Sequence, residues 1–298
     1  MQKINVFECG PRDGWQNLRQ ILSTEQKLKY IDGLFSCGIS SMEITSFVSP
    51  RAIPQMIDAS DVARYCVEKY PDKELYALIP NYKGAELAND AGIKCVSYVI
   101  SLSETHNKAN INRTHEQSFE ELARIRESFP DMGICIGLAT TFGCPFEGIP
   151  ELDRVIDFIG RISDAEVNSL YLADTIGIAD PAQVRRTVAA VKESFPQMQL
   201  QVHIHDTRGM GLVNTLAAIE SGVDTVQSTL GGLGGCPFAP GASGNTATED
   251  LVYMLERMGY DTGIDFQSLL SLSKQQRAEI DGVYSGHQMN ITAAGSCC

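Results

Sequence analysis

The stretch INVFECGPRDGWQNLRQILSTEQKLKYIDGLFSCG (residues 4–38) contains, in order, a strand signal and a helix signal. Residues 4–8 form a short apolar and β-branched run, which predicts a β-strand. Further along, Ser23 and Gln26 have the spacing of a capping box, and Gly38 supplies a C-terminal stop. Between them, four apolar side chains fall on one helical stripe: Leu28, Ile31, Leu34 and Phe35. The stretch therefore predicts a strand followed by an amphipathic helix.

The same order of strand and helix recurs along almost the whole chain. The predicted strands span residues 4–8, 42–45, 75–79, 96–101, 134–139, 169–172, 200–205 and 225–228. Eight strands alternating with helices imply a parallel sheet and favour its closure into a barrel. A doubly wound open sheet is the alternative, but no G-x-G-x-x-G motif follows the first strand. We therefore predict an α/β fold, a (β/α)8 TIM barrel forming a single domain over residues 1–298, with about 265–298 as a C-terminal extension.

Composition argues against several classes of function. The chain of 298 residues has 37 acidic and 24 basic side chains, a formal net charge of −13 and no block rich in Lys and Arg. We expect no nucleic-acid partner, because binding phosphates needs clustered cations. No stretch of 18 or more apolar residues occurs, so we expect no membrane span or membrane partner. Nine scattered cysteines and a strand signal at the N-terminus predict a cytoplasmic protein without a signal peptide.

Two histidines end the seventh predicted strand, in the run Val202-His203-Ile204-His205-Asp206. Side chains alternate along a strand, so His203 and His205 point to the same face. Polar residues at the carboxyl ends of barrel strands face the active-site mouth, where two imidazoles can share a metal ion. The alternative is a pair of hydrogen-bonded core histidines. Asp206 points the other way, and we expect it to support a metal ligand by a hydrogen bond or to anchor the following loop.

Charged side chains follow or lie in three other predicted strands. Arg12 and Asp13 stand in a sharp Gly-Pro turn, where Asp13 can complete the metal site and Arg12 can face substrate oxygens. Glu43 lies in an apolar strand, and a buried carboxylate needs a partner such as Arg12 or a metal-bound water. Asp174 follows Tyr171-Leu172-Ala173 on the sixth strand, and the same reasoning about a buried carboxylate applies to it. The alternatives are a surface salt bridge for Arg12 with Asp13 and an outward-facing Glu43.

A glycine-rich loop, GGLGGCPFAPGASGN (231–245), follows the eighth predicted strand. Its six glycines in fifteen residues favour a flexible segment, and Cys236 in its middle suggests a lid that delivers a proton donor. A plain glycine loop with an incidental cysteine is the alternative. Asn245 ends the loop, where it can cap the next helix or offer its amide oxygen to a metal ion.

Four of these side chains make a mixed nitrogen and oxygen donor set: Asp13, His203, His205 and Asn245. The set contains no thiolate and leaves coordination positions open. It suits an octahedral divalent ion, Mg2+ or Mn2+, while Fe2+, Co2+ and Zn2+ stay open.

On these residues the chain resembles the 3-hydroxy-3-methylglutaryl-CoA lyases of the DRE-TIM metallolyase superfamily. The similarity extends from about residue 3 to residue 258. It is densest in GPRDGWQN (10–17), EITSFVSP (43–50), CPFEG (144–148), ADTIG (173–177), HIHDTRG (203–209) and GLGGCPFAPGASGNTATEDLVYML (232–255). The resemblance implies a retro-Claisen cleavage of 3-hydroxy-3-methylglutaryl-CoA, an acyl-CoA substrate, to acetyl-CoA and acetoacetate. It also implies a homodimer with a role in leucine catabolism and ketone body formation.

The resemblance further implies roles for single residues. Arg12 would polarise the substrate and stabilise an enolate oxyanion, and Cys236 would protonate the enolate carbon. His203, or a carboxylate on the same metal, would accept the hydroxyl proton. The ligands of that metal would be Asp13, His203, His205 and Asn245. In the surrounding polar shell would lie Glu43 and Asp174, with Gln16 near the acyl group.

The chain departs from the family pattern at a few positions. Trp15 replaces a common leucine, and Ala139 and Thr140 replace a Ser-Cys pair on the fifth strand, where we expect them to face the acyl pocket. The acyl group therefore stays open between the methylglutaryl thioester and a relative such as citramalyl-CoA. A Claisen-type synthase and a metal-binding structural barrel are further alternatives. Lys108 and Arg113 are candidate contacts for the phosphates of CoA.

Overall fold

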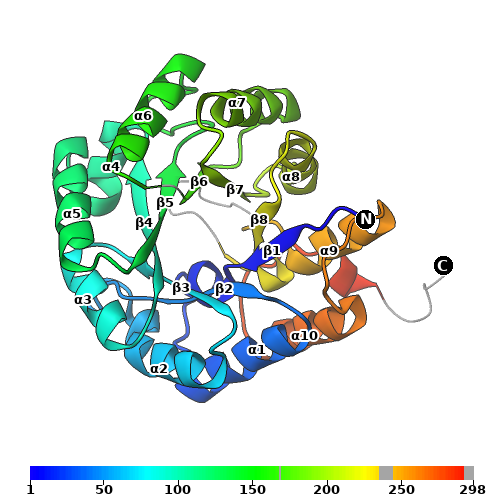
Figure 1. Cartoon of the computed structure of the whole chain (residues 1–298). Coiled ribbons are helices and arrows are strands. Elements are labelled where there is room, and N and C mark those ends of the chain that lie inside the picture. Colours follow the sequence, from blue (N-terminus) through cyan, green and yellow to red (C-terminus); the bar gives the residue numbers. More distant parts are fainter. Residues whose placement is uncertain (168, 235–243, 292–298) are drawn as a thin grey trace.

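The computed structural model describes residues 1–167, 169–234 and 244–291. Its eight strands are all parallel and pair in sequence order, and the pairing of β1 with β8 closes them into a barrel (Figure 1). The strands are β1 (Asn5–Glu8), β2 (Ser41–Ser46), β3 (Glu74–Ile79), β4 (Cys95–Ser101), β5 (Gly133–Ala139), β6 (Ser169–Asp174), β7 (Gln199–Ile204) and β8 (Thr225–Ser228). The predicted (β/α)8 TIM barrel is confirmed, with every predicted strand displaced by at most two residues at either end.

The helices form a ring around the strands (Figure 1). They are α1 (Thr24–Ser36), α2 (Ala59–Lys69), α3 (Tyr82–Asp90), α4 (Glu104–Ile111), α5 (His115–Ser128), α6 (Leu152–Asp164), α7 (Pro181–Ser194), α8 (Gly211–Glu220), α9 (Thr248–Arg257) and α10 (Phe266–Glu279). Four short turns of helix accompany them: η1 (Gly10–Gly14), η2 (Pro54–Met56), η3 (Leu230–Gly232) and η4 (Gln288–Asn290). Of these, η1 and η3 directly follow β1 and β8, so they lie at the carboxyl ends of those strands.

The first helix shows how local sequence sets the element boundaries. The Ser23 hydroxyl accepts from the Gln26 backbone N–H, and the Gln26 side chain accepts from the Ser23 N–H, each at 3.3 Å. This capping box satisfies two donors that a helix start would otherwise leave free. Gly38 follows α1 with φ of +105°, a conformation that glycine adopts without steric cost. Both predicted signals therefore act where the sequence places them.

Alternation along the strands separates two buried layers. In β6, Leu170 and Leu172 join the apolar core between barrel and helices. Tyr171 and Ala173 belong to a second, smaller cluster together with Cys135 of β5. Because successive side chains of a strand point to opposite faces, this second cluster fills the inside of the barrel. Side chains inside the barrel form the base on which the site at its mouth is built.

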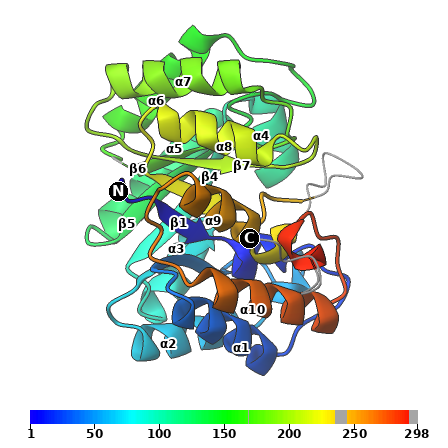
Figure 2. The same cartoon turned by 90° about the vertical axis from the view of Figure 1, so that its right-hand side faces the viewer.

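The last long helix, α10, packs against α1 and α9, and Figure 2 shows it beside α1. Its Gln276 reaches the mouth of the barrel, donating to the Leu230 carbonyl at 3.0 Å and accepting from the Trp15 indole at 3.4 Å. Ser273 donates to Glu249 of α9 at 2.7 Å. The segment that the sequence set apart from about residue 265 thus supports the loops after β1 and β8.

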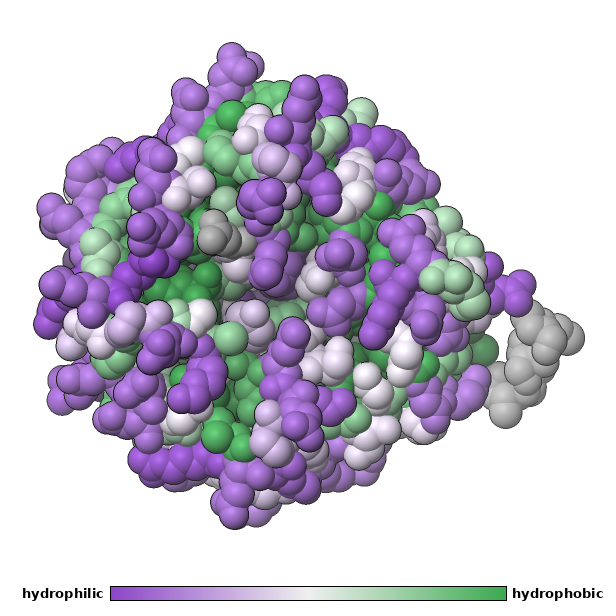
Figure 3. Space-filling model, in the orientation of Figure 1, coloured by the Kyte–Doolittle hydropathy of each residue, from purple (hydrophilic) through white to green (hydrophobic). Residues whose placement is uncertain are grey.

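The outer surface is mainly hydrophilic in the view of Figure 3, with hydrophobic patches between the charged and polar side chains. Among the described residues, no helix is both long and apolar enough to cross a membrane.

Candidate active site

The candidate site is built at the carboxyl ends of β1, β7 and β8. Asp13 lies in η1, directly after β1, while His203 lies in β7 and His205 follows it. An isolated antiparallel bridge between His205 and Asn245 brings in the segment after β8. Each predicted metal ligand is therefore carried by backbone that the barrel strands hold in place.

Asp13, His203 and His205 each turn one ligand atom toward the others, and these atoms all lie within 4.8 Å of one another. The Nε2 atom of His203 is 3.1 Å from Nε2 of His205 and 3.8 Å from Oδ2 of Asp13. Both Asp13 and His203 are buried. The predicted convergence of one carboxylate and two imidazoles thus occurs, in a volume that suits a single ion.

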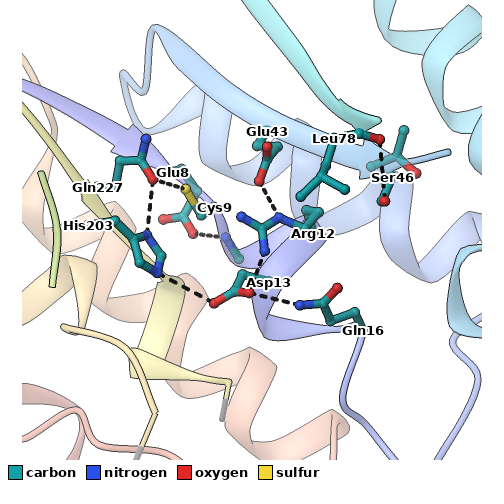
Figure 4. A network of polar contacts seen from close by, with 12 residues as sticks. Glu8, Cys9, Arg12, Asp13, Gln16, Glu43, Ser46, Leu78, His203 and Gln227 are labelled. Atoms are coloured by element: carbon teal, nitrogen blue, oxygen red, sulfur yellow. Dashed lines mark hydrogen bonds and ion pairs between the residues drawn. The ribbon is translucent and has the colours of Figure 1, made fainter. Parts of the chain in front are cut away.

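Gln227 of β8 contacts one ring nitrogen of His203, and the other ring nitrogen faces Asp13 (Figure 4). Its Oε1 atom lies 3.0 Å from Nδ1 of His203, so Nδ1 carries the proton and donates it. The Nε2 atom then presents its lone pair toward Asp13 and His205. Burial, followed by the charge of His205, lowers the pKa of His203 to about 3. The imidazole is therefore neutral at physiological pH, as a metal ligand must be.

Unpaired buried atoms supply an independent test of whether a metal fits. Asn245 donates through Nδ2 to Oδ2 of Asp13 at 2.7 Å, while its Oδ1 is buried without a hydrogen-bond partner. Nδ1 of His205 is buried and unpartnered as well. Buried polar atoms are rarely left in this state, and such exceptions mark places where an ion or water belongs. The donor set of Asp13, His203, His205 and Asn245 therefore fits a divalent cation.

Arg12 lies between two carboxylates, Glu43 and Asp13, and pairs with both (Figure 4). Burial is the largest influence on Asp13 and opposes its charge, but the charge of Arg12, the two histidines and the hydrogen bond from Asn245 together outweigh it and lower the pKa of Asp13 to about 2. Asp13 therefore stays ionised across the neutral range. The pairing places Arg12 beside the triad of Asp13, His203 and His205, and its Nη2 makes no hydrogen bond with any described residue.

The remaining predicted residues occupy three different environments. Gln16 donates to Oδ1 of Asp13 at 2.8 Å and lines the cavity at the mouth. Asp174 uses both oxygens to accept the backbone N–H groups of Ile178 and Ala179, at 3.0 and 3.1 Å, so it holds the loop after β6. Cys236 lies outside the described residues.

A cavity of about 470 Å3 opens beside the triad. Arg12 and His203 belong to its wall, together with an apolar group that β3, β4 and neighbouring segments contribute: Val48, Ile53, Leu78, Ile79, Val99 and Ile111. Arg113, one of the two candidate phosphate contacts, also lines it, whereas Lys108 is exposed outside this lining. The site therefore combines a polar centre with an apolar pocket, the usual composition of a small-molecule site.

Ala139 and Thr140, the two departures from the family pattern on the fifth strand, differ in whether they face the cavity. Ala139 lines the cavity, as expected. Thr140 is not part of the lining, so the expectation that it faces the acyl pocket is wrong for this residue. Its φ of +59° turns the chain at the end of β5, and its hydroxyl accepts from the Ser103 N–H and donates to the Ala139 carbonyl.

A model of the HMGL-like family matches residues 3–275. The chain belongs to the HMGL-like family. The hydroxymethylglutaryl-CoA lyase of Bacillus subtilis is 41% identical over 275 residues, 92% of each chain. The mitochondrial hydroxymethylglutaryl-CoA lyase of Homo sapiens is 42% identical over 271 residues, 90% of this chain and 83% of that one. The resemblance inferred from the motifs is confirmed.

Solved structures give the same result. The HMG-CoA lyase of Acinetobacter baumannii, determined with coenzyme A and 3-methylmalate, matches with a TM-score of 0.93 and 39% identity, covering 99% of this chain and 97% of that chain. As a member of the HMGL-like family, this chain is an enzyme, and the reaction class is a carbon–carbon lyase.

Sequence reasoning missed two residues that hold the site of this lyase together. Gln227 was read only as part of β8, although it orients His203. Glu8 of β1 accepts from the backbone N–H groups of Gly10 and Leu230, at 2.7 and 2.9 Å, and from the Thr248 hydroxyl at 2.6 Å. Glu8 thereby joins η1, which carries Asp13, to the segment after β8. The signal available for both was a polar side chain inside an otherwise apolar strand.

Replacing Gln227 with leucine is expected to weaken metal binding about 10–100-fold, because His203 would lose the acceptor that fixes its tautomer and ring orientation. Titration calorimetry with Mn2+ measures this affinity without any substrate. Gln227→Glu keeps an acceptor at the same position and serves as the matched control, with an affinity within about fivefold of the unaltered chain. Equal affinities for the Leu and Glu variants would show that His203 does not depend on this contact.

Because Glu8 is buried, we expect the stability of the folded protein to depend on pH. Burial raises the pKa of Glu8 from 4.5 to about 7, although its three hydrogen bonds act in the opposite direction. Between these two pH values the folded protein keeps a proton that the unfolded chain loses. The free energy of unfolding should therefore decrease as the pH rises from about 4.5 to about 7. The size is on the order of a few kcal/mol. Glu8→Gln should flatten this decline in denaturant titrations, whereas the exposed-site control Glu193→Gln should keep the decline. An unchanged pH profile in Glu8→Gln would refute the assignment.

Proposed function

We propose that this HMGL-like enzyme cleaves 3-hydroxy-3-methylglutaryl-CoA to acetyl-CoA and acetoacetate in a metal-dependent retro-Claisen reaction. The observation that carries the proposal is the convergence of Asp13, His203 and His205 directly beside Arg12, at the carboxyl ends of the barrel strands. The relatives named above act, by their names, on this same thioester. A role in leucine catabolism and ketone body formation would follow from that substrate.

The ligands in this proposal are Asp13, His203, His205 and Asn245, holding Mg2+ or Mn2+. Hard oxygen donors and two imidazoles match either ion. A divalent ion bound there would supply Lewis-acid chemistry, lowering the pKa of the substrate's 3-hydroxyl group.

Arg12 would stabilise the oxyanion that forms when the bond between C2 and C3 breaks. Its Nε and Nη1 atoms are held by Glu43 and Asp13, which leaves Nη2 available to the thioester oxygen. A fixed donor of this kind stabilises developing charge without having to reorganise during the reaction. We propose Glu43 as the positioning residue for Arg12 and Gln16 as a neighbour of the acyl group. Asp174 would support the site through the loop after β6.

Two proton transfers complete the reaction. His203 and Asp13 are the candidates for the base, because a hydroxyl group between Nε2 and Oδ2, which are 3.8 Å apart, could pass its proton to either atom. Use of His203 as base would compete with its role as a ligand, since Nδ1 is engaged by Gln227. Cys236, from the glycine-rich loop, would protonate the enolate carbon to give acetyl-CoA.

The proposal also covers the substrate class, the assembly of chains and the cellular compartment. An acyl-CoA substrate is supported by the Acinetobacter baumannii structure, which was determined with coenzyme A. We propose a homodimer of chains in which residues 1–298 form one catalytic domain, with about 265–298 as its C-terminal extension. Six described cysteines are free thiols, which supports a reducing compartment such as the cytoplasm.

A related thioester such as citramalyl-CoA stays the second candidate substrate, because Ala139 lines the cavity in place of the larger polar residue of the family pattern. The decisive experiment incubates the purified protein with each thioester, with Mg2+ or with a chelator, and assays the released keto acid. We expect acetoacetate from the methylglutaryl thioester only when metal is present. Failure to cleave either thioester with Mg2+ would overturn the proposed reaction, and unchanged rates with chelator would overturn its metal dependence.

A further inference from the structure

Tyr171 is the single bulky side chain on one wall of the cavity. Strands β5 and β6 contribute Gly137, Ala139, Tyr171 and Ala173 to the cavity lining. Three of these have no side chain larger than a methyl group. The tyrosine side chain is buried, and its ring centre lies 6.0 Å from that of His203. The space next to the triad on this wall is therefore set by one aromatic ring.

The ring can take this position because residue 137 is glycine. Gly137 and Tyr171 are directly paired in the β5–β6 register, so both face the inside of the barrel. A Cβ atom added to Gly137 would lie 2.2 Å from both Cζ and the hydroxyl oxygen of Tyr171. Such an approach is far below van der Waals contact, so any other residue at 137 would displace the ring. The two residues form one steric unit.

Strand order places this unit beneath the metal ligands. Ala173 pairs with His203 in the β6–β7 register, and Tyr171 pairs with Gln201, two residues earlier along the strand. Tyr171 therefore lies deeper in the barrel than the triad, above the layer that contains Cys135. For a substrate whose hydroxyl-bearing carbon, C3, lies at the triad, this ring would bound the space below that carbon.

We propose that Tyr171, lying over Gly137, forms the floor of the acyl pocket and restricts the enzyme to thioesters with a small substituent at C3. The inference rests on the proposed lyase function and adds a specificity-determining residue to it. The cavity lining also includes the apolar group from β3, β4 and neighbouring segments, so a longer alkyl branch is excluded by the ring and not by a lack of hydrophobic surface.

The steric unit is tested first through stability, without substrate. Gly137→Ala should lower Tm by about 5 °C, because overpacking of this size is strongly destabilising. In a Tyr171→Ala background, the same change should lower Tm by less than about 2 °C, since the space is then free. Gly160→Ala on α6 is the matched control, where the nearest atom is 3.9 Å from the added Cβ. Equal losses in both backgrounds would overturn the coupling.

Specificity is tested with methyl and propyl versions of the 3-hydroxy-3-alkylglutaryl-CoA thioester. Tyr171→Ala should shift the ratio of kcat/KM values toward the propyl thioester about tenfold or more, while Tyr171→Phe should stay within about threefold. An unshifted ratio in Tyr171→Ala, or an equal shift in Tyr171→Phe, would overturn the inference. Cleavage of neither thioester by the unaltered chain would instead overturn the proposed function itself.

Discussion

Arg12→Met is expected to lower kcat on 3-hydroxy-3-methylglutaryl-CoA by about three orders of magnitude with little change in KM, because the oxyanion contact strengthens only as charge develops. The same variant should lose about 3–5 kcal/mol of stability, since Glu43 and Asp13 would be left as buried carboxylates without their cation. Steady-state kinetics and denaturant unfolding measure the two effects separately.

A second substitution separates catalysis from folding at Arg12. In Arg12→Met with Glu43→Gln, one of the two stranded charges is gone, so a large part of the stability should return. The rate should stay low, because the donor to the thioester oxygen is still missing. Recovery of kcat along with stability would mean that Arg12 serves the fold alone. A near-normal kcat in Arg12→Met would remove it from the mechanism.

Asp13→Asn should cost more metal affinity than the Gln227 substitution, at least about 100-fold for Mn2+, and should reduce the lyase rate by about 1,000-fold. The substitution preserves the shape of the side chain and removes the one negative charge of the donor set. Losing this charge should weaken metal binding more than losing Gln227, because Gln227 contacts a proposed ligand and would not touch the metal itself. Calorimetry without substrate reports the affinity. Manganese-dependent acetoacetate release reports the rate.

Asp206→Asn is the matched control for the Asp13 substitution. This carboxylate is next to His205 in sequence, but its Oδ1 atom accepts from the Gly211 backbone N–H at 2.6 Å, which an amide oxygen can also do. Asp206 thus anchors the loop after β7, one of the two roles expected for it. Metal affinity in Asp206→Asn should stay within about threefold of the unaltered chain. Equal Mn2+ affinity in Asp13→Asn and the unaltered chain would remove Asp13 from the ligand set.

The barrel and the convergence of candidate metal ligands were predictable because they rest on local patterns. Alternating apolar runs locate the strands, and the spacing of His203 and His205 fixes their common face whatever surrounds them. Asn245 was recognisable as a ligand type, yet the bridge to His205 that positions it joins segments forty residues apart. Sequence patterns carry no information about such a pairing until the closed strand order is known.

The supporting residues could not be predicted for the same reason. Gln227 matters because β8 lies beside β7, and Glu8 matters because β1 lies beside β8. Likewise, Gly137 and Tyr171 are thirty-four residues apart and ordinary as single letters, and only their shared register makes them a unit. Local periodicity determines the strands, whereas closure of the sheet determines which buried polar groups become partners.

The pairing of β1 with β8 places the candidate active site across the seam where the two ends of the sheet meet. Asp13 enters from one side of that seam, and the two histidines and Asn245 enter from the other. During synthesis on the ribosome, the carboxylate emerges more than two hundred residues before the amide, so the nascent chain cannot assemble the centre until its last strand has docked. We therefore expect a partly made chain to lack lyase activity, and a cation bound by these side chains would link the two ends of the closed sheet.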